Sequence, residues 1–347
     1  MENNKGKITV LHVLRSSCFS GAENIAITII KYMNEYYRCV YTSVNGSIAE
    51  KLKENNIEYY PLKEFSILEL KRVIYRLNPS IIHAHDYTAS IICSMLKGKA
   101  KLISHLHHES GGNWRKFCYR CFFSRMDRVV LVSEALLTGI PICHDNKITI
   151  LNNPIDSDRI QMMARQETEQ SKEYDLIYLG RLNSIKGCVR FINIVYELKR
   201  LGFHVKAVML GEGEQYKKCQ NLIKYYQISV DMLGFVENPY SILKKSKILI
   251  MTSKNEGFGL AVMEANVLGV PALVTPVGYM LNYFGEGAEE LCYTDQEFCE
   301  KIIQLLRDPD LYNQYKEKTF YRTRKLENLY HYTHKIKRIY EEYSGNN

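Results

Sequence analysis

The sequence contains no apolar run near the roughly 20 residues that a membrane-spanning helix needs. Its longest apolar stretches, such as SKILIMTS and RVVLVS, are far shorter. The first residues, MENNKGK, lead straight into an apolar strand pattern and contain no hydrophobic leader segment. We therefore expect no membrane-spanning segment and a cytoplasmic protein, for which contact with the inner membrane face is considered below.

A large excess of charge is also absent. The 347 residues include 46 Lys and Arg against 38 Asp and Glu, a net charge of +8 spread along the chain. No nucleic-acid-binding module is recognisable, so we expect no nucleic-acid partner. An anionic substrate or an anionic membrane surface fits this charge equally well. The length suits about two domains, and 46% apolar with 24% charged residues is an ordinary globular composition.

The cysteines lack the partners that a metal site needs. Ten cysteines are spread along the chain, and the close pair Cys118 and Cys121 has C-x-x-C spacing. No second pair and no histidine follows at ligand spacing. We therefore expect reduced thiols without disulfides, no metal site and no cofactor.

Short β-rich runs alternate with longer helical segments, which favours parallel βαβ units. Before residue 160 the expected strands are 7–14, 38–44, 80–85, 101–107, 128–133 and 147–152, with helices over 22–36, 66–77 and 87–97. After the polar stretch 161–175 the expected strands are 174–180, 204–210, 230–235, 247–253 and 271–275, with helices over 186–201, 214–226 and 260–268.

The restart of this pattern predicts an α/β protein with two Rossmann-like, doubly wound domains that face a central cleft. We expect the first over residues 1–165 and the second over 172–310. Residues 311–347 form a C-terminal helical segment that is expected to pack back across the domains. In such folds ligands bind at the carboxyl ends of the strands, so we look there for chemistry.

The segment SKNEGFGLAVMEA follows an expected strand and opens a helix. Glu256 lies in the loop and Glu264 follows eight positions later, within the helix. Gly257 and Gly259 let a ligand approach the backbone, and the amides at a helix start can hold a phosphate. Carboxylates accept hydrogen bonds from sugar hydroxyls. The spacing alone does not separate this interpretation from a helix-terminal acid and a surface acid.

Two more loops follow strands in the same way. Arg181 and Lys186 in GRLNSIKG suit a diphosphate, although an Arg–Lys pair is more commonly just two solvated surface cations. Gly21 in RSSCFSGAEN lets a ligand approach the first helix. The fingerprint G-x-G-x-x-G is missing from the chain, which argues against a nicotinamide or flavin enzyme.

Histidines gather at the ends of two expected strands in the first half. They are His83 and His85 in HAHD, before Asp86, and His105, His107 and His108 in SHLHH. Because catalytic residues collect at strand carboxyl ends, we expect at least one of them in the active site. The alternative is that they are structural histidines whose ring nitrogens form hydrogen bonds within the protein.

Together these motifs resemble the GT-B glycosyltransferases of family 4, retaining enzymes that use nucleotide sugars. SKNEGFGLAVMEANVLGVPALVT resembles the E-x7-E motif of the family and the strand after it, and GRLNSIKG resembles its GRL…KG segment. MLGEGE, LGFVEN and SGAE resemble its glycine turns. The resemblance covers nearly the whole chain and is strongest over 176–276. The loop after Gly278 departs from the family pattern, which leaves the donor sugar open.

The resemblance implies a role for each motif. Arg181 and Lys186 would bind the donor diphosphate, Glu264 the ribose hydroxyls, and Glu256 the transferred sugar. Further donor contacts would come from the backbone amides of Gly257, Phe258, Gly259 and Leu260, from the turn Gly234, Phe235 and Val236 along the nucleobase, and from Gly21. His107 matches the family histidine near the reacting sugar. His105 is an alternative to it, and His85, Asp86 and His105 are expected on the acceptor side.

The implied reaction is transfer of a hexose from a UDP- or GDP-sugar, with retention, to a glycan or lipid-linked saccharide in cell-surface polysaccharide biosynthesis. It would proceed by same-face attack without a metal. Two alternatives stay open. One is a sugar-nucleotide 2-epimerase of the same architecture, and the other is a non-catalytic protein that binds nucleotide sugars.

Residues 113–128 combine five Lys and Arg and one Asp with five aromatic residues. A basic, aromatic helix of this kind can lie in a membrane interface. It can equally pack its aromatic face on the first domain. The sequence leaves both interpretations open.

Overall fold

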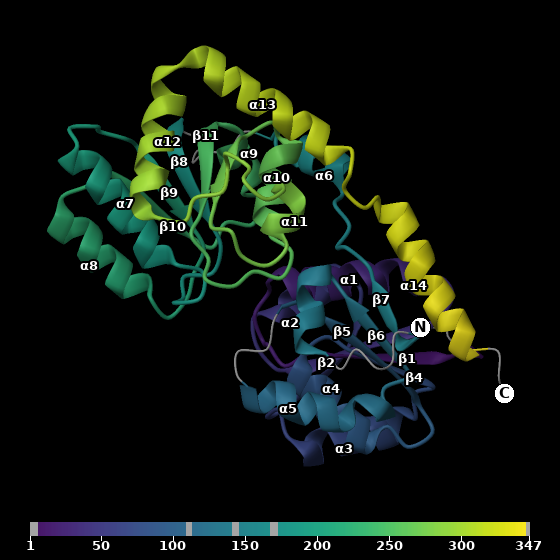
Figure 1. Cartoon of the computed structure of the whole chain (residues 1–347). Helices are drawn as coiled ribbons and strands as arrows, with labels where there is room; N and C mark the ends of the chain where they lie inside the picture. Colours follow the sequence, from purple (N-terminus) through teal and green to yellow (C-terminus); the bar gives the residue numbers. More distant parts are fainter. Residues whose placement is uncertain (1–5, 109–112, 141–145, 167–172, 345–347) are drawn as a thin grey trace. The chain divides into compact units, whose positions relative to one another are not determined.

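A computed structural model describes residues 6–108, 113–140, 146–166 and 173–344. The chain forms two compact units (Figure 1). The first comprises residues 1–154 and 327–347, and the second comprises residues 155–326. Each unit has a parallel β-sheet and its own helices, so the expected pair of doubly wound α/β sheets is confirmed.

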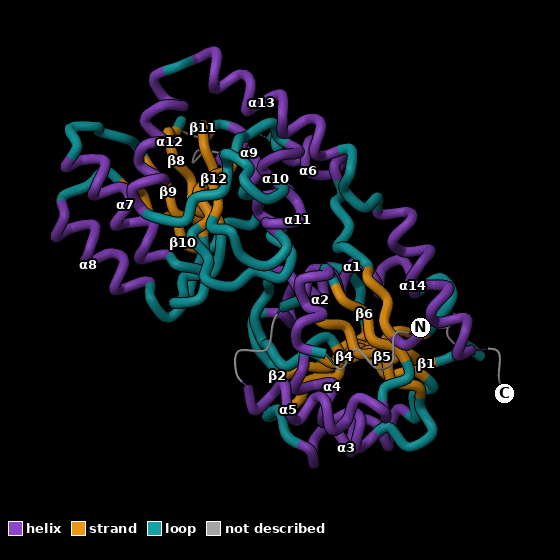
Figure 2. Tube along the Cα trace, viewed as in Figure 1, coloured by secondary structure: helices purple, strands orange, loops and turns teal. Residues whose placement is uncertain are grey.

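The first unit is built on a seven-stranded parallel sheet of order β3-β2-β1-β4-β5-β6-β7. Figure 2 shows strands of this sheet in orange, with helices in purple around them. Its strands are β1 (Thr9–Val13), β2 (Arg38–Val44), β3 (Glu58–Leu62), β4 (Ile81–Ala84), β5 (Lys101–Leu106), β6 (Arg128–Leu131) and β7 (Ile148–Ile150). The strand order reverses at β1, which pairs with both β2 and β4. Such a switch point opens a crevice at the carboxyl ends of the strands.

Helices cover both faces of this sheet. They are α1 (Gly21–Met33), α2 (Ile48–Glu54), α3 (Ile67–Leu77), α4 (Tyr87–Leu96), α5 (Asn113–Phe122) and α14 (Leu329–Ser344). Figure 1 shows α3, α4 and α5 on the side opposite α1 and α14. Core residues Val10, Ile81 and Ile103 of the sheet share a buried cluster with Tyr332 and Ile336 of α14. The last helix of the chain is therefore part of the first core.

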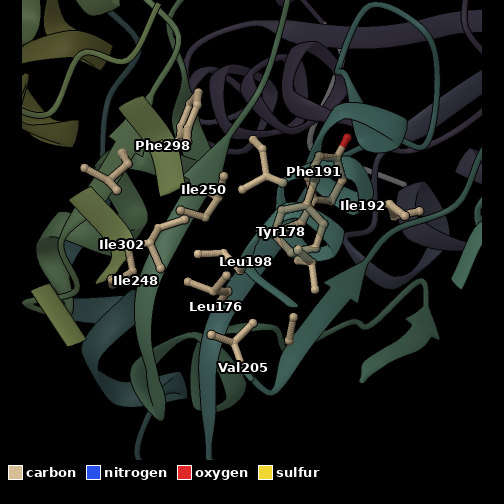
Figure 3. Close-up of a cluster of buried hydrophobic side chains, with 14 of the residues drawn as sticks. Leu176, Tyr178, Phe191, Ile192, Leu198, Val205, Ile248, Ile250, Phe298 and Ile302 are labelled. Carbon is tan, nitrogen blue, oxygen red and sulfur yellow. The ribbon is translucent and has the colours of Figure 1, made fainter. Parts of the chain in front are cut away.

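The second unit has a five-stranded parallel sheet of order β10-β9-β8-β11-β12. Its strands are β8 (Tyr174–Leu179), β9 (Ala207–Leu210), β10 (Val230–Gly234), β11 (Ser246–Met251) and β12 (Ala272–Val274). Its helices are α6 (Ser157–Met163), α7 (Cys188–Arg200), α8 (Tyr216–Tyr226), α9 (Tyr240–Lys244), α10 (Leu260–Val267), α11 (Met280–Phe284), α12 (Asp295–Arg307) and α13 (Pro309–Thr323). Figure 3 shows its core, in which Leu176 and Ile248 of the strands meet Phe191 and Phe298 of the helices.

The structure differs from the expected boundaries in three places. The units divide after Pro154 rather than after residue 165, because α6 packs on α9 and α10. The expected C-terminal segment is split, since α13 belongs to the second unit and α14 to the first. β3 was not expected at all. It contains Pro61 and lies at the sheet edge, where a missing backbone donor is tolerated. Residues 167–172 of the expected linker lie outside the described residues.

Two further expectations concern membrane-spanning helices and the state of the cysteines. No helix within the described ranges is both long enough and apolar enough to cross a membrane. The cysteines that the structure describes are free thiols, including Cys118 and Cys121 on α5.

Candidate active site

A salt bridge joins the two most informative motifs of the second unit. The Lys186 ammonium donates to both carboxylate oxygens of Glu256, at 2.7 and 2.8 Å. Ser253, two residues past the end of β11, donates to the same carboxylate at 3.2 Å. The Glu256 side chain is only 12% exposed, so this pair sits in partly desolvated surroundings. Two segments 70 residues apart thus meet at the carboxyl edge of the sheet.

The loop between β8 and α7 is tied down by side chains. The Tyr178 hydroxyl donates to the carbonyls of Arg181 and Lys186, at 3.0 and 3.3 Å. The Lys186 amide donates to the Asn183 side chain at 2.8 Å. These contacts fix the loop backbone, while the Arg181 side chain itself is exposed. The loop therefore presents one exposed and one paired cation beside the start of a helix.

Two glycines allow the loops at this edge of the sheet to pack closely against one another. Gly187 has φ +71°, and a Cβ there would lie 2.1 Å from the Thr252 carbonyl oxygen. Gly278 has φ +55°, and a Cβ there would lie 1.6 Å from the Glu256 carbonyl oxygen. Both positions need the left-handed conformation as well as the space. The backbones of three loops can thus approach each other at the expected ligand site.

The segment after Glu256 turns directly into α10. Gly259, with φ +83°, precedes the first helical residue, Leu260. The Phe258 side chain is buried and stacks on Tyr279, with ring centroids 4.7 Å apart. The phenyl ring is thus packed in the protein interior, and the segment can offer a ligand its backbone amides at the positive end of the helix.

Glu264 lies on α10 in unusual surroundings for an acid. It accepts a hydrogen bond from the Tyr240 hydroxyl at 3.2 Å. Burial raises the pKa of its carboxyl group to about 7, and the hydrogen bond from Tyr240 and the positive charge of Arg159 only partly offset this effect. The ionised form of such a desolvated carboxylate is stabilised when sugar hydroxyls donate hydrogen bonds to it.

The turn after β10 completes the group of expected donor-site residues. Gly234 has φ +69°, and its carbonyl accepts from the Gly211 amide at 2.7 Å. Phe235 is 58% exposed, and Val236 is partly exposed. An exposed aromatic ring beside a fixed backbone turn suits a flat nucleobase. The expected donor-site residues from residue 181 to 264 thus all lie at the carboxyl end of the second sheet or on α10.

In the first unit, two of the expected site residues, Gly21 and Asp86, lie at helix starts. Gly21 is exposed at the start of α1, where Ser20 donates to the Glu23 carboxylate. Asp86 caps α4 by accepting from the Ala89 amide at 2.8 Å, and it also accepts from the Arg15 amide at 3.3 Å. This N-cap role accounts for the acid at position 86.

The histidines at the strand ends are buried together. His85 and His105 are at most 1% exposed, and His107 is 8% exposed. His107 Nε2 lies 3.1 Å from His85 Nδ1. Burial is the largest cause that lowers the pKa of each of these rings, so they are neutral near pH 7. The assignment of His107 to the reacting sugar, with His105 as its alternative, stays a prediction.

The structure also reveals residues that the sequence did not single out. Tyr178, Ser253 and Tyr240 contact the expected site residues, and His12 on β1 contacts His85. Tyr178 and Ser253 lie at or just past strand carboxyl ends, and that position was a usable signal. Tyr240 carried no such signal, because it lies on a short helix outside any motif.

The aromatic residues of the basic segment 113–128 divide between core and surface. Tyr119 and Phe123 are buried, whereas Trp114 is 73% and Phe117 is 59% exposed. The two exposed rings stack at 5.9 Å on α5. Packing on the first unit therefore accounts for only part of this aromatic set.

Comparisons with known proteins agree across both units. A family model described as glycosyl transferases group 1 matches residues 160–321, and one described as glycosyltransferase family 4 matches residues 45–159. The N-acetyl-alpha-D-glucosaminyl L-malate synthase of Bacillus anthracis is 25% identical over 298 residues, covering 77% of this chain and 76% of that protein. The poly(glycerol-phosphate) alpha-glucosyltransferase of Bacillus subtilis (strain 168) is 26% identical over 63% of this chain. The match spans only 34% of that relative.

Solved structures show the same fold at low identity. The structure of Anabaena Alr3699/HepE in complex with UDP and glucose has a TM-score of 0.81 at 14% identity, covering 96% of this chain and all of that one. The pneumococcal O-GlcNAc transferase GtfA in complex with UDP and GlcNAc has a TM-score of 0.74 at 13% identity, covering 98% and 100%. The expected fold class, GT-B, is thereby confirmed.

Proposed function

The chain belongs to the GT-B glycosyltransferases of family 4 type, and from this premise we propose that it transfers a hexose-type sugar from a nucleotide diphosphate donor to a glycan or lipid-linked saccharide. We propose retention at the anomeric carbon, independence from metal ions, and a place in cell-surface polysaccharide biosynthesis. The observation that carries the proposal is the Lys186–Glu256 pair beside the start of α10.

The donor site of the proposal uses each group in that arrangement. The exposed Arg181 and the ammonium of Lys186 bind the diphosphate, together with the amides that open α10. Glu264 accepts from the ribose hydroxyls, and Glu256 contacts the transferred sugar. The turn at Gly234 and Phe235 lies along the base.

The chemical step follows from where charge develops. The acceptor hydroxyl oxygen forms a bond to the anomeric carbon on the face that the diphosphate leaves. The bond from that carbon to the phosphate oxygen breaks, and its electron pair and the hydroxyl proton go to the diphosphate. Fixed cations and amide dipoles stabilise the charge on the leaving group, and losing one such group can cost on the order of 10²–10³ in rate. Because Glu256 is already bound by Lys186 and Ser253, we do not assign it as a covalent nucleophile.

We favour a uridine donor over a guanosine donor. Alr3699/HepE and GtfA, both similar to this chain in fold, are described in complex with UDP together with glucose or GlcNAc. The Bacillus subtilis and Bacillus anthracis relatives are named for glucosyl and N-acetylglucosaminyl products. These names support a gluco-configured sugar, and the acceptor stays undefined.

The experiment incubates the full chain with UDP-glucose, UDP-GlcNAc and the matching GDP-sugars, with and without saccharide and lipid-linked acceptors. Nucleotide release and the anomeric proton couplings of the product are followed by NMR. A transferase releases UDP only with an acceptor and yields an α-linked product from an α-linked donor. Conversion of the donor sugar without an acceptor would instead identify an epimerase. Binding without turnover would identify a binding protein.

A peripheral membrane contact is proposed as a second property. Trp114 and Phe117 are exposed on α5 beside the exposed Arg115 and Arg120, a pattern suited to an anionic interface. The test is flotation with vesicles of neutral and anionic lipid, comparing the wild type with a variant in which Arg115, Lys116 and Arg120 are neutralised. The proposal expects binding to anionic vesicles that the variant loses, and equal binding by both would overturn it.

A further inference from the structure

Five histidines and one tyrosine of the first unit form a single series of side-chain contacts, which we name the histidine chain. Its members are His12 of β1, His83 of β4, His85 just after β4, His105 of β5, His107 just after β5, and Tyr340 of α14. They continue the sheet face whose core residues are Val10, Ile81 and Ile103. Five of the six members are at most 1% exposed, and His107 is 8% exposed. Polar groups thus occupy what would otherwise be core positions.

The first arm of the histidine chain runs from the sheet edge to α14. His107 Nε2 lies 3.1 Å from His85 Nδ1. His85 Nε2 lies 3.0 Å from His12 Nδ1, and His12 Nε2 lies 3.4 Å from the Tyr340 hydroxyl. Both ring nitrogens of His85 and of His12 are therefore used.

The second arm begins at the same hydroxyl. The Tyr340 oxygen lies 2.7 Å from His83 Nδ1, and His83 Nε2 lies 3.2 Å from His105 Nδ1. Tyr340 is the only link between the arms among the hydrogen bonds of the described residues. A residue close to the C-terminus thus connects groups on three strands.

The rings of the histidine chain are neutral. Burial lowers the pKa of His12 to about 3 and holds the pKa values of the other four well below the usual value for histidine. A neutral imidazole has one N–H donor and one lone-pair acceptor. Each ring can therefore donate through one nitrogen only.

This restriction couples the protonation of all five rings. Each contact between two rings joins the Nδ1 of one to the Nε2 of the other, and the Tyr340 hydroxyl joins His12 Nε2 to His83 Nδ1. Each contact needs one donor and one acceptor. If one ring carries its proton on Nδ1, all of them must do so, and the same holds for Nε2. A mixed arrangement within an arm would place two N–H groups or two lone pairs against each other. A mismatch between the arms would leave the buried Tyr340 O–H without an acceptor, or one ring nitrogen without a donor. The Tyr340 hydroxyl accepts from one arm and donates to the other, so it transmits the order.

The two ends of the chain favour one of these orders. His107 Nδ1 and His105 Nε2 are buried atoms without a hydrogen-bond partner in the described ranges. With all protons on Nδ1, His107 ends in an N–H and the fully buried His105 ends in a lone pair. Orphaned buried N–H donors are rarer than under-satisfied acceptors, so the N–H belongs at the end nearer the surface.

We propose that His12, His83, His85, His105 and Tyr340 are positioning residues that hold His107 as a neutral imidazole with its proton fixed on Nδ1. This assignment rests on the proposed function in that the fixed N–H would donate a hydrogen bond to an oxygen of the reacting sugar. A donor set before the substrate arrives needs no reorientation during the reaction. The buried histidines thereby act through His107 and make no contact with the substrate.

Metal binding is the competing explanation for so many histidines. Two groups of three, His12 with His83 and His85, and His85 with His105 and His107, have ring nitrogens within 4.8 Å of one another. However, His83 stacks on His85 at 4.3 Å, and His105 stacks on His107 at 4.2 Å. Imidazole lone pairs lie in the ring plane, so stacked rings do not direct them at a common ion. The geometry suits a series of hydrogen bonds better.

The first test reads the tautomers directly. The full chain, labelled with ¹⁵N in its histidine rings, is examined by two-bond ¹H–¹⁵N spectra near pH 7.5, and each ring is assigned by single substitution. The expected result is the Nδ1–H form for all five rings. A ring in the Nε2–H or imidazolium form would overturn the proposal. Stoichiometric zinc in the purified protein, whose removal changes these signals, would overturn it as well.

The second test breaks the link between the arms. In Tyr340→Phe the tautomers of one arm no longer constrain those of the other, so at least one ring should change its tautomer. The value of kcat should fall about tenfold or more, with little change in donor KM. The control is Tyr332→Phe on the same helix, where an equally buried hydroxyl has no partner among the described residues. It should change neither readout.

The outcomes separate this proposal from the proposed function. Unchanged ring spectra and unchanged kcat in Tyr340→Phe would overturn the histidine chain as a positioning device. If the wild type shows the five Nδ1–H rings but no transfer with any donor, the proposed function fails while the coupled tautomers stand.

Discussion

Replacing Glu264 by Gln should stabilise the protein while weakening donor binding. Burial raises the pKa of this carboxyl group from 4.5 to about 7, so its ionised form is disfavoured in the folded state. The folded protein holds the proton to higher pH than the unfolded chain does. The loss of folding stability caused by ionising this carboxyl group is therefore small below pH 4.5. It grows as the pH rises towards 7 and is complete above 7. Glutamine has no charge and avoids this penalty.

The size of the effect follows from the same pKa values. The change from 4.5 to about 7 corresponds to about 3 kcal/mol at most. Because the residue is still partly exposed, solvent screening reduces this figure, and we expect about 2 kcal/mol at pH 8.5. For the second unit, residues 155–326, that raises the melting temperature by roughly 5 °C. Near pH 5 the two proteins should differ by less than about 1 kcal/mol.

The assay is thermal and urea unfolding of both proteins between pH 5 and 8.5. The control is Glu317→Gln, an exposed acid on α13 of the same unit, which should change stability by less than about 0.5 kcal/mol at every pH. Glu264→Gln should also bind UDP about tenfold more weakly than the wild type, because a charged hydrogen-bond acceptor is lost. A stability difference between Glu264→Gln and the wild type that does not grow between pH 5 and 8.5 would refute the reasoning.

The remaining predictions concern the backbone and charges of the two units. Lys186→Ala should lower kcat by about 10²–10³ and leave the Glu256 carboxylate without its cation. Adding Glu256→Gln to it should recover stability in urea unfolding but not turnover, and recovered turnover would contradict the assigned roles. Gly187→Ala should cost more than about 2 kcal/mol and abolish UDP binding, because its Cβ would collide with the Thr252 carbonyl; a normal melting curve would count against the loop geometry. Asp86→Ala should cost about 1 kcal/mol as the loss of a helix cap, with donor KM unchanged, and a large rise in KM would instead indicate contact with substrate.

The sequence predicted the two sheets and their strands well, because buried parallel strands read as short apolar runs. It missed β3, whose edge position tolerates Pro61 and leaves four of its five residues at least partly exposed. It placed Lys186 and Glu256 on separate loops with separate roles, and only the fold shows that they form a salt bridge. Pairing across 70 residues has no local signal.

The histidines show the same limit more sharply. Their positions at strand ends were readable, and both the catalytic and the structural interpretation were considered. What spacing could not reveal was the connection through Tyr340, which lies 257 residues after His83 in the sequence. Contacts of that kind depend on which helix covers which face of a sheet, and that is settled by the packing of α14 on the first core.

The most direct test of the donor site is the melting temperature of the full chain with UDP, GDP and ADP, measured on the wild type and on Lys186→Ala. Lys217→Ala, an exposed lysine of α8 in the same unit, is the control. At a hundredfold excess over Kd, a bound nucleotide adds about 2.7 kcal/mol to stability. We predict a rise of several degrees with UDP in the wild type and in Lys217→Ala, and little or none in Lys186→Ala. No rise with any nucleotide, or an equal rise in all three proteins, would contradict a diphosphate site at the Lys186–Glu256 pair.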